Sequence, residues 1–229
     1  MTIHEMQNLN RTTIEYASSI IVPDMTLVEL RMLCEEYMLS HGADSFWYWD
    51  VGAFVFSGDR TAVSVSGQKY KTDTSKIKQN DIITIDLSPQ RGCIWGDYAR
   101  TLVIENGCVI KNIDSIKNEE WRNGIKTEEY LHNAMRNFVN TETTFEELFY
   151  YANDQIKLCG YVNLDFLGNL GHSIVKDKKD RIYIEKGNKE KLSNVEAFTF
   201  EPHISLPKSL YGFKMENIYA FHNNKLIEL

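Results

Sequence analysis

The sequence predicts a single α+β domain built from two similar halves. The segment Thr26–Gly42 opens with the T-x-x-E spacing of a helix capping box, carries apolar residues at helical period and ends at a glycine. The segment Thr144–Gly160 repeats the same cap, length and glycine at a constant offset of 118 residues. Strand-like runs rich in aromatic and β-branched residues follow both segments. We therefore expect a duplicated α/β unit in which each half gives a long helix and then strands.

Length and composition favour an ordinary globular protein. Its 229 residues are 43% hydrophobic and 25% charged, which suits one domain over residues 1–229 with halves at about 10–118 and 119–229. The formal charge of −7 argues against a nucleic-acid or membrane partner, and no run approaches the roughly 18 apolar residues of a membrane span. The four cysteines include no CxxC pair, which predicts neither disulfides nor structural zinc. We expect a cytoplasmic protein.

In the first half, residues 10–22 are predicted to form a helix that ends before Pro23. The capped helix of Thr26–Gly42 follows. The runs FWYWDVGAFVF and SGDRTAVSVSG are typical of a strand, a turn and a second strand. Residues 81–104 then have the pattern of a hairpin, with Pro89 and Gly92 in its turn.

The second half has the same general order. We expect a connection over residues 105–118, a helix over 119–138 and the repeated capped helix. The lysine-rich run 176–192 is most simply a solvated hairpin or loop. The runs AFTFEPHI and YGFKMENIYAF are the last two strand candidates.

The hairpin carries two aspartates where a strand normally places apolar residues. If its turn is centred on Arg91 and Gly92, Asp86 lies opposite Asp97, and opposed residues of an antiparallel pair point to the same face. Like charges side by side destabilise a sheet, so a bound cation would explain the pair. The alternative is two exposed aspartates at the ends of a turn.

The second half adds His172, Glu201 and Glu216, all in strand-like surroundings. Singly, the glutamates are also compatible with solvent faces of edge strands, and the histidine with a core or loop position. Together with Asp86 and Asp97 they make an oxygen-rich, single-histidine set suited to two divalent ions about 3.5–4 Å apart. Mn²⁺, Co²⁺, Fe²⁺ and Zn²⁺ all fit these donors.

The order of these residues resembles the five-ligand signature of the pita-bread metallopeptidases, a family that includes methionine aminopeptidases, Xaa-Pro peptidases and creatinase. The matching motifs are the two aspartates eleven residues apart, then GHSI, FTFEP and KMEN. The resemblance covers nearly the whole chain and implies the pita-bread fold, with a curved antiparallel sheet and helices outside. In size the chain is closer to a minimal methionine aminopeptidase than to the family members with a long N-terminal domain.

The resemblance also implies roles for the five residues. Asp86 would chelate one ion, Asp97 and Glu216 would bridge both, and His172 and Glu201 would hold the second. Glu201 would also act as the general base for the bridging water.

Three departures from the family pattern bear on the substrate. No histidine precedes the first aspartate, where the run Ser64–Ser66 stands; Lys179 takes the place of a second histidine; and Ser173 replaces a glycine. By the resemblance, both missing histidines would contact the substrate amide. His203 is expected to face the same side as Glu201 and to replace a lost proton-transfer group, or else to be a surface or supporting histidine.

The aromatic run Phe46–Trp49 fits the core, a dimer surface or a substrate pocket. The sequence as a whole predicts a dinuclear metallohydrolase that cleaves a C–N bond in a short peptide or amide-like small molecule, and a homodimer is an open alternative to a monomer. The alternatives in function are a creatinase-like enzyme acting on a non-peptide metabolite and a noncatalytic binding protein of the same fold.

Overall fold

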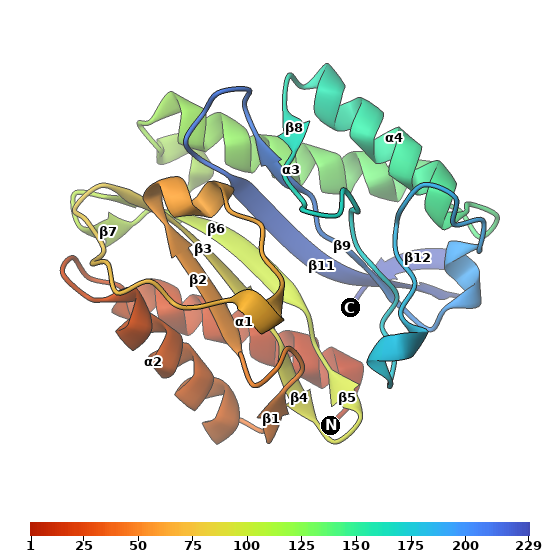
Figure 1. Ribbon diagram of the computed structural model, residues 1–229, viewed down its shortest axis with the longest axis horizontal. Coiled ribbons are helices and arrows are strands. Elements are labelled where there is room, and N and C mark those ends of the chain that lie inside the picture. Colours follow the sequence, from red (N-terminus) through yellow and green to blue (C-terminus); the bar gives the residue numbers. More distant parts are fainter.

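The computed structural model describes residues 1–229. The chain folds into two halves that are joined through one curved antiparallel sheet (Figure 1). The first half contains α1 (Ile3–Ile20), α2 (Leu27–Ser40), β1 (Ser45–Phe46), β2 (Ala53–Ser57), β3 (Asp81–Leu87), β4 (Pro89–Arg91), β5 (Ile94–Trp95), β6 (Tyr98–Glu105) and β7 (Cys108–Val109). The second contains α3 (Glu119–Phe138), α4 (Phe145–Leu158), β8 (Val162–Asn163), β9 (Phe198–Phe200), β10 (His203–Ser205), β11 (Phe213–His222) and β12 (Lys225–Glu228). Five short 3-10 helices, η1 to η5, lie at Gly58–Ala62, Gly67–Lys69, Ile113–Ser115, Lys178–Asp180 and Leu192–Asn194.

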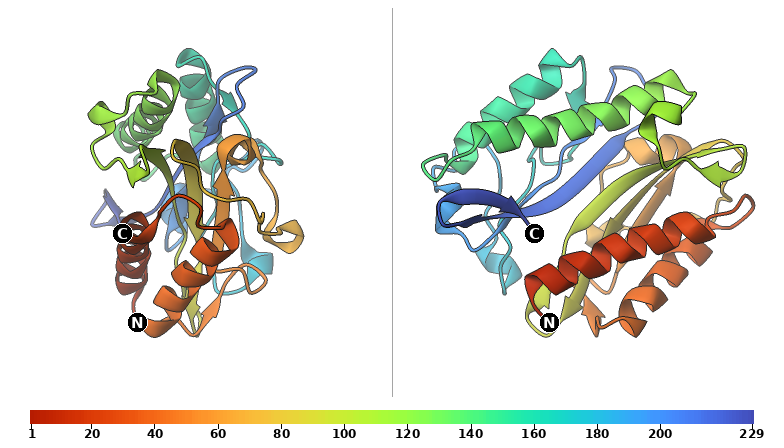
Figure 2. Two further views of the ribbon diagram at one scale, coloured as in Figure 1. Left: turned by 90° about the vertical axis from the view of Figure 1, so that its left-hand side faces the viewer. Right: turned by 180° about the vertical axis from the view of Figure 1, so that it is seen from behind.

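The helix repeat is reproduced residue for residue. Helix α4 has the bounds of α2 shifted by 118 residues, and a threonine immediately before each helix closes a capping box with the glutamate three residues on. Capping satisfies backbone N–H groups that the first helical turn leaves unpaired. Seen from behind, the long helices α1 and α3 both lie in front of the sheet formed by β6 and β11 (Figure 2).

Each half has its own apolar core. One cluster of 18 buried residues joins α1 and α2 to β2 and β3, and another of 20 joins α3 and α4 to β9, β10 and β11. Residues Ile83, Ile85 and Leu87 of β3 face the first core, so the alternate residues Thr84 and Asp86 point to the opposite face. That face carries the candidate site.

The main sheet has the strand order β2-β3-β6-β11-β10-β8, and the pairing of β6 with β11 joins the halves. Asp86 is opposite Ala99 on β6, and Ala99 is in turn opposite Glu216 on β11. Opposed residues share a face, so the two carboxylates flank the small Ala99 side chain on one side of the sheet. Residues from both halves therefore meet at the centre of the sheet.

The predicted hairpin register is wrong by two residues, because Asp86 pairs with Ala99 and not with Asp97. The two-residue turn is Gly92 and Cys93, since Arg91 pairs directly with Ile94. Gly92 has a φ of 59°, the left-handed conformation that glycine adopts without strain. A shift of two preserves the side-chain alternation, so the expected common face of the two aspartates is retained.

Two other expectations need correction. Helix α1 begins at Ile3 and not at residue 10, because Thr2 and Glu5 form a capping box that was not recognised in the sequence. The run after β2 is not a second strand: it forms the 3-10 helix η1 and then an irregular segment over residues 63–66.

The lysine-rich run is a loop with a short 3-10 helix, as predicted. None of the helices combines the length and apolar character needed to cross a membrane.

Candidate metal centre

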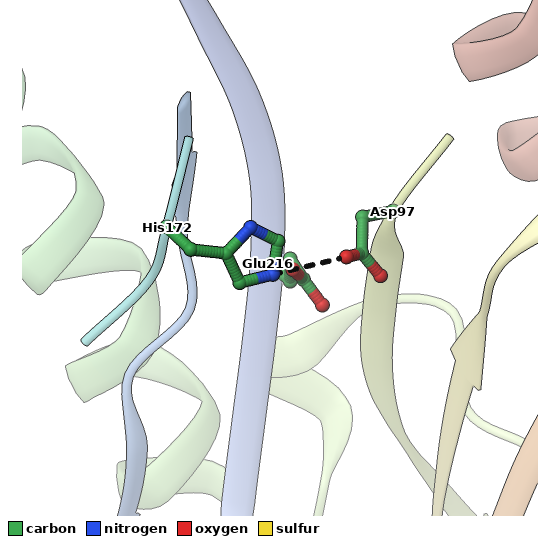
Figure 3. Close-up of side chains that lie close together, drawn as sticks. All are labelled: Asp97, His172 and Glu216. Carbon is green, nitrogen blue, oxygen red and sulfur yellow. Dashed lines mark ion pairs between the residues drawn. The ribbon is translucent and has the colours of Figure 1, made fainter. Parts of the chain in front are cut away.

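Three of the five predicted ligands converge on one point. Asp97, His172 and Glu216 each offer a ligand atom, and these atoms lie within 4.8 Å of one another. Figure 3 shows the side chains approaching from three separate segments, with the ion pair between Asp97 Oδ2 and His172 Nε2 at 3.4 Å. All three residues are buried. A carboxylate, carboxylate and imidazole set of this kind suits a divalent transition metal.

The backbone around His172 fixes its ring. Its backbone N–H donates to Thr199 Oγ1 at 3.0 Å, and its carbonyl accepts from the Thr199 N–H at 2.7 Å. Gly171, with a φ of 140°, permits this approach, because a Cβ there would lie 2.2 Å from the Thr199 carbonyl oxygen. His172 Nδ1 lies 3.2 Å from the Ser173 carbonyl oxygen, so the Nδ1–H donates to that oxygen and Nε2 faces the acidic residues.

Glu216 is the side chain that most clearly needs a cation. It is fully buried, and neither carboxylate oxygen has a hydrogen-bond partner. Burial, followed by the nearby charge of Asp97, raises the pKa of Glu216 well above its ordinary value. An orphaned buried carboxylate beside a second carboxylate and an imidazole lone pair fits a metal ion, which would satisfy all three.

Asp86 and Glu201, the other two predicted ligands, contact a lysine. Lys214 Nζ lies 2.6 Å from Asp86 Oδ2, 3.0 Å from Glu201 Oε2 and 3.5 Å from Glu216 Oε2. Burial alone would lower the pKa of Lys214, but these carboxylates together raise it well above its ordinary value, so the ammonium keeps its charge. Burial, opposed by Lys214, raises the pKa of Asp86 to about 6. For Glu201, Lys214 and His172 outweigh burial and lower the pKa.

Lys214 was not recognised in the sequence, although a signal was present. It stands two residues before Glu216 on β11, and side chains two apart on a strand share a face. Once Glu216 is assigned to the site, the K-x-E spacing places a cation beside it.

Tyr48 also belongs to the site; from the sequence, its aromatic run fitted the core, a dimer surface or a substrate pocket. Its hydroxyl donates to Asp97 Oδ2 at 2.9 Å and lies 3.0 Å from His172 Nε2. Burial and the charge of Asp97 raise the pKa of Tyr48 well above its ordinary value, so the hydroxyl keeps its proton. Its neighbour Trp47 is buried and stacks on Trp95, with ring centroids 4.2 Å apart. The aromatic run therefore contributes to both the core and the site.

His203 lies at the wall of the same cavity as Glu201, and its Nε2–H donates to the Thr61 carbonyl oxygen at 2.7 Å. Burial lowers the pKa of His203 to about 4, so the ring is neutral at neutral pH. Ser64 and Ser66 line the cavity where the family pattern has a histidine. Lys179 is exposed in η4 and pairs with Asp177 at 3.1 Å, so it supplies no substitute for the second missing histidine.

The cavity over the site has a volume of about 170 Å³. Its acidic lining residues are Asp86, Asp97, Asp165 and Glu201, whereas much of the rest of its lining is apolar. The apolar wall consists of Tyr48, Trp49, Phe54, Phe56, Val63, Val65, Phe166 and Leu167. A concave site with apolar walls and a few convergent polar groups is typical of a small-molecule site.

Solved structures share this architecture. A prolidase from Pyrococcus furiosus matches with a TM-score of 0.81 and 21% identity, covering 99% of this chain and 61% of that protein. An X-Pro aminopeptidase from Thermotoga maritima gives 0.78 and 21%, covering 99% and 58%. A methionine aminopeptidase from Rickettsia prowazekii gives 0.73 and 15%, covering 96% and 92%. The chain thus spans about 60% of the length of the first two. No curated protein sequence matches it.

The chain has the pita-bread fold that the sequence predicted, with an acidic, histidine-containing centre. Residues 2–223 match the sequence pattern of Metallopeptidase family M24, and the chain belongs to that family. Members of this family use divalent metal ions, which agrees with the donor set of Asp97, His172 and Glu216.

Proposed function

We propose that this protein is a metal-dependent hydrolase that cleaves a C–N bond, peptide or amide-like, in a small substrate, in the manner of an Xaa-Pro or methionine aminopeptidase. One observation carries the proposal: Asp97, His172 and Glu216 come from separate segments of both halves and converge beside a small cavity, which Asp97 and His172 line. Three buried groups with ligand chemistry seldom converge without a cation, because the two carboxylates would otherwise repel each other.

These three residues would hold the metal ion. A bound divalent ion supplies a water of lowered pKa and polarises the substrate carbonyl. The predicted pair of ions would need Asp86 and Glu201 as well, and both of these carboxylates contact Lys214. Mn²⁺, Co²⁺, Fe²⁺ and Zn²⁺ all remain compatible with the donors.

Glu201 and His203 are the proposed catalytic residues of the protein chain. Glu201 lines the cavity, its Oε1 lies 3.6 Å from His172 Nε2, and its lowered pKa keeps it ionised as a general base requires. His203 uses Nε2–H to bond Thr61, which leaves Nδ1 as the ring atom free to accept a proton.

The size and lining of the cavity support a small substrate with an apolar part. The names of the structural neighbours, a prolidase, an X-Pro aminopeptidase and a methionine aminopeptidase, favour a short peptide. We also propose that residues 1–229 form one catalytic domain with halves at about 10–118 and 119–229; a cytoplasmic location stays a prediction from composition.

The second candidate is a creatinase-like reaction on a non-peptide metabolite. It is favoured by the serines at positions 64 and 66 and by the exposed Lys179, because no histidine stands at either place where a peptidase of this family has one. A noncatalytic binding protein is the third candidate, and the retained ligand set argues against it.

The test uses protein loaded with Mn²⁺ or Co²⁺ and a panel of dipeptides beginning with Met or ending with Pro or Ala. We expect hydrolysis of at least one panel member. Glu201→Gln should lower kcat by about 10²–10⁴-fold, the range for a lost general base. Lys179→Ala, on the exposed loop, is the matched control and should leave kcat unchanged.

Failure on the peptide panel with turnover of a small guanidino compound such as creatine would favour the second candidate. A protein that binds metal yet hydrolyses neither group of compounds would contradict the proposal and support the noncatalytic alternative.

A further inference from the structure

Lys214 lies where three of the four acidic side chains of the site meet. Its Nζ is within 3.0 Å of one oxygen each from Asp86 and Glu201, and 3.5 Å from Glu216. Distances of 2.6 and 3.0 Å are those of charge-assisted hydrogen bonds. The lysine side chain is only 15% exposed, so this is a buried arrangement and not a mobile surface pair.

A second metal ion would need carboxylate oxygens from the same two residues. An ion coordinated by Asp86 Oδ2 and Glu201 Oε2 would take the oxygen atoms that now accept hydrogen bonds from the ammonium. It would also bring a second positive charge against Lys214 in a buried site, where such repulsion is poorly screened. An ion and the Lys214 ammonium therefore exclude each other at this position.

By contrast, no cation from the chain reaches the centre of the Asp97, His172 and Glu216 cluster. The Asp97 carboxylate has polar contacts only with the Tyr48 hydroxyl and the His172 imidazole. Glu216 retains two buried oxygens without hydrogen bonds, and its nearest cation is Lys214 at 3.5 Å. This end of the site still requires a positive charge.

The charges of the predicted ligands, Lys214 and Arg181 balance with one ion. The four predicted carboxylate ligands carry four negative charges, and Lys214 supplies one positive charge. Arg181 supplies another beside the site: its guanidinium carbon lies 5.1 Å from the centre of the Tyr48 ring, and two of its buried nitrogens have no hydrogen-bond partner. Asp165, a fifth carboxylate at the cavity, accepts hydrogen bonds from the backbone N–H groups of Leu167 and Asn169 and lies outside this group. One divalent ion completes the balance, whereas a second would leave two positive charges in excess in a buried environment.

We propose that this protein binds a single divalent ion, held by Asp97, His172 and Glu216, and that the Lys214 ammonium takes the place of a second ion between Asp86 and Glu201. The inference rests on the proposed function only for the presence of a metal ion. It makes Lys214 a built-in cation of the site and makes Asp86 its partner, not a metal ligand.

The experiment measures metal content. Wild-type protein, Lys214→Met and Lys214→Arg are stripped of metal, titrated with Mn²⁺ in a calorimeter, and assayed for bound metal by mass spectrometry after desalting. We expect one equivalent for the wild type and for Lys214→Arg, which keeps the charge. Lys214→Met, which keeps the length but removes the charge, should bind two equivalents and give the paramagnetic resonance spectrum of a coupled Mn²⁺ pair.

Two equivalents in the wild type would overturn the inference, as would one equivalent in a folded Lys214→Met protein. If Lys214→Met does not fold, the wild-type stoichiometry and Lys214→Gln decide in the same way. Failure here is distinct from failure of the proposed function: two bound ions with peptide hydrolysis would refute only the inference, and one bound ion without any hydrolysis would refute only the function.

Discussion

The two ends of the acidic cavity differ in what balances their carboxylates. At one end Asp86 and Glu201 contact the Lys214 ammonium at 2.6 and 3.0 Å. At the other, Asp97, His172 and Glu216 converge, Lys214 comes no nearer than 3.5 Å to Glu216 Oε2, and the Glu216 oxygens have no hydrogen-bond partner. Each end contributes one aspartate and one glutamate, so the type of carboxylate alone does not decide which of them bind metal. In our proposal, the position of Lys214 decides it.

Strand β11 contributes one residue to each end of the cavity. Lys214 and Glu216 are two residues apart on β11 and share a face, while Ala99 on the neighbouring strand β6 leaves room between Glu216 and Asp86. Because β11 belongs to the second half and Asp86 to the first, the ion pair between Lys214 and Asp86 also joins the two halves.

The largest effect is expected from removing Lys214 in metal-free protein. Lys214→Met leaves buried carboxylates without their cation, and breaking a buried ion pair from one side costs about 3–5 kcal/mol. The free energy of unfolding, measured by urea denaturation in the presence of a chelator, should fall by about that amount. Added Mn²⁺ should restore most of it, since an ion would then replace the ammonium. Equal stability of the two proteins in chelator would contradict the contrast between the two ends.

The next effect compares one aspartate from each end. Asp97→Asn removes a proposed ligand, and we expect metal affinity to fall by more than about 100-fold, beyond the 10–100-fold loss typical of residues that only support a ligand. Asp86→Asn is the matched variant at the end of the cavity where Lys214 lies, and it should change metal affinity by less than about tenfold. Calorimetric titration with Mn²⁺ gives both values. Similar losses in the two variants would mean that both ends hold metal.

The sequence contained most of this fold and part of the site. The capping boxes at Thr26 and Thr144 predicted α2 and α4 because a cap is a local interaction. The run after β2 alternates β-branched residues yet forms no strand, since strand formation depends on a partner elsewhere in the chain. The hairpin register was wrong because it depended on which residue starts a two-residue turn.

The site shows the same limit. The expected pairing of Asp86 opposite Asp97 predicted a common face for the two aspartates, and a register shift of two does not change that face. The contact between Lys214 and Asp86 joins residues 128 positions apart, and only the pairing of β6 with β11 brings them together. Sequence spacing predicts which face a side chain occupies, whereas the separation of the five predicted ligands into two unequal groups follows from tertiary packing.

A smaller effect, on the pH dependence of stability, is expected from His132, a buried histidine outside the site. His132 is buried, with Nδ1 2.7 Å from the Tyr219 hydroxyl and Nε2 3.1 Å from the Met215 carbonyl oxygen. Burial lowers its pKa to about 3. The unfolded chain therefore binds a proton near pH 6.5 that the folded protein does not, and the stability that neutral His132 provides is lost as pH falls below about 6.5.

Between pH 6.5 and 4.5 this histidine should account for about 2 kcal/mol of lost stability. Urea denaturation of metal-free protein across that range, compared with His132→Gln, measures the contribution. The wild type should lose more stability on acidification than the variant. A parallel pH dependence of the two proteins would show that His132 is not the residue responsible.

The smallest effect is expected at Tyr48, which contacts the metal end without charge. Its hydroxyl bonds Asp97 and lies beside His172 Nε2, so Tyr48→Phe removes an orienting contact but no proposed ligand. We expect metal affinity to fall by about tenfold, the lower end of the range for groups that orient ligands. Tyr183→Phe is the control, because that ring also packs near His172, at 6.1 Å, but its hydroxyl bonds none of the ligands. A loss in Tyr48→Phe as large as that of Asp97→Asn would instead make the tyrosine oxygen a ligand in its own right and extend the metal end to four residues.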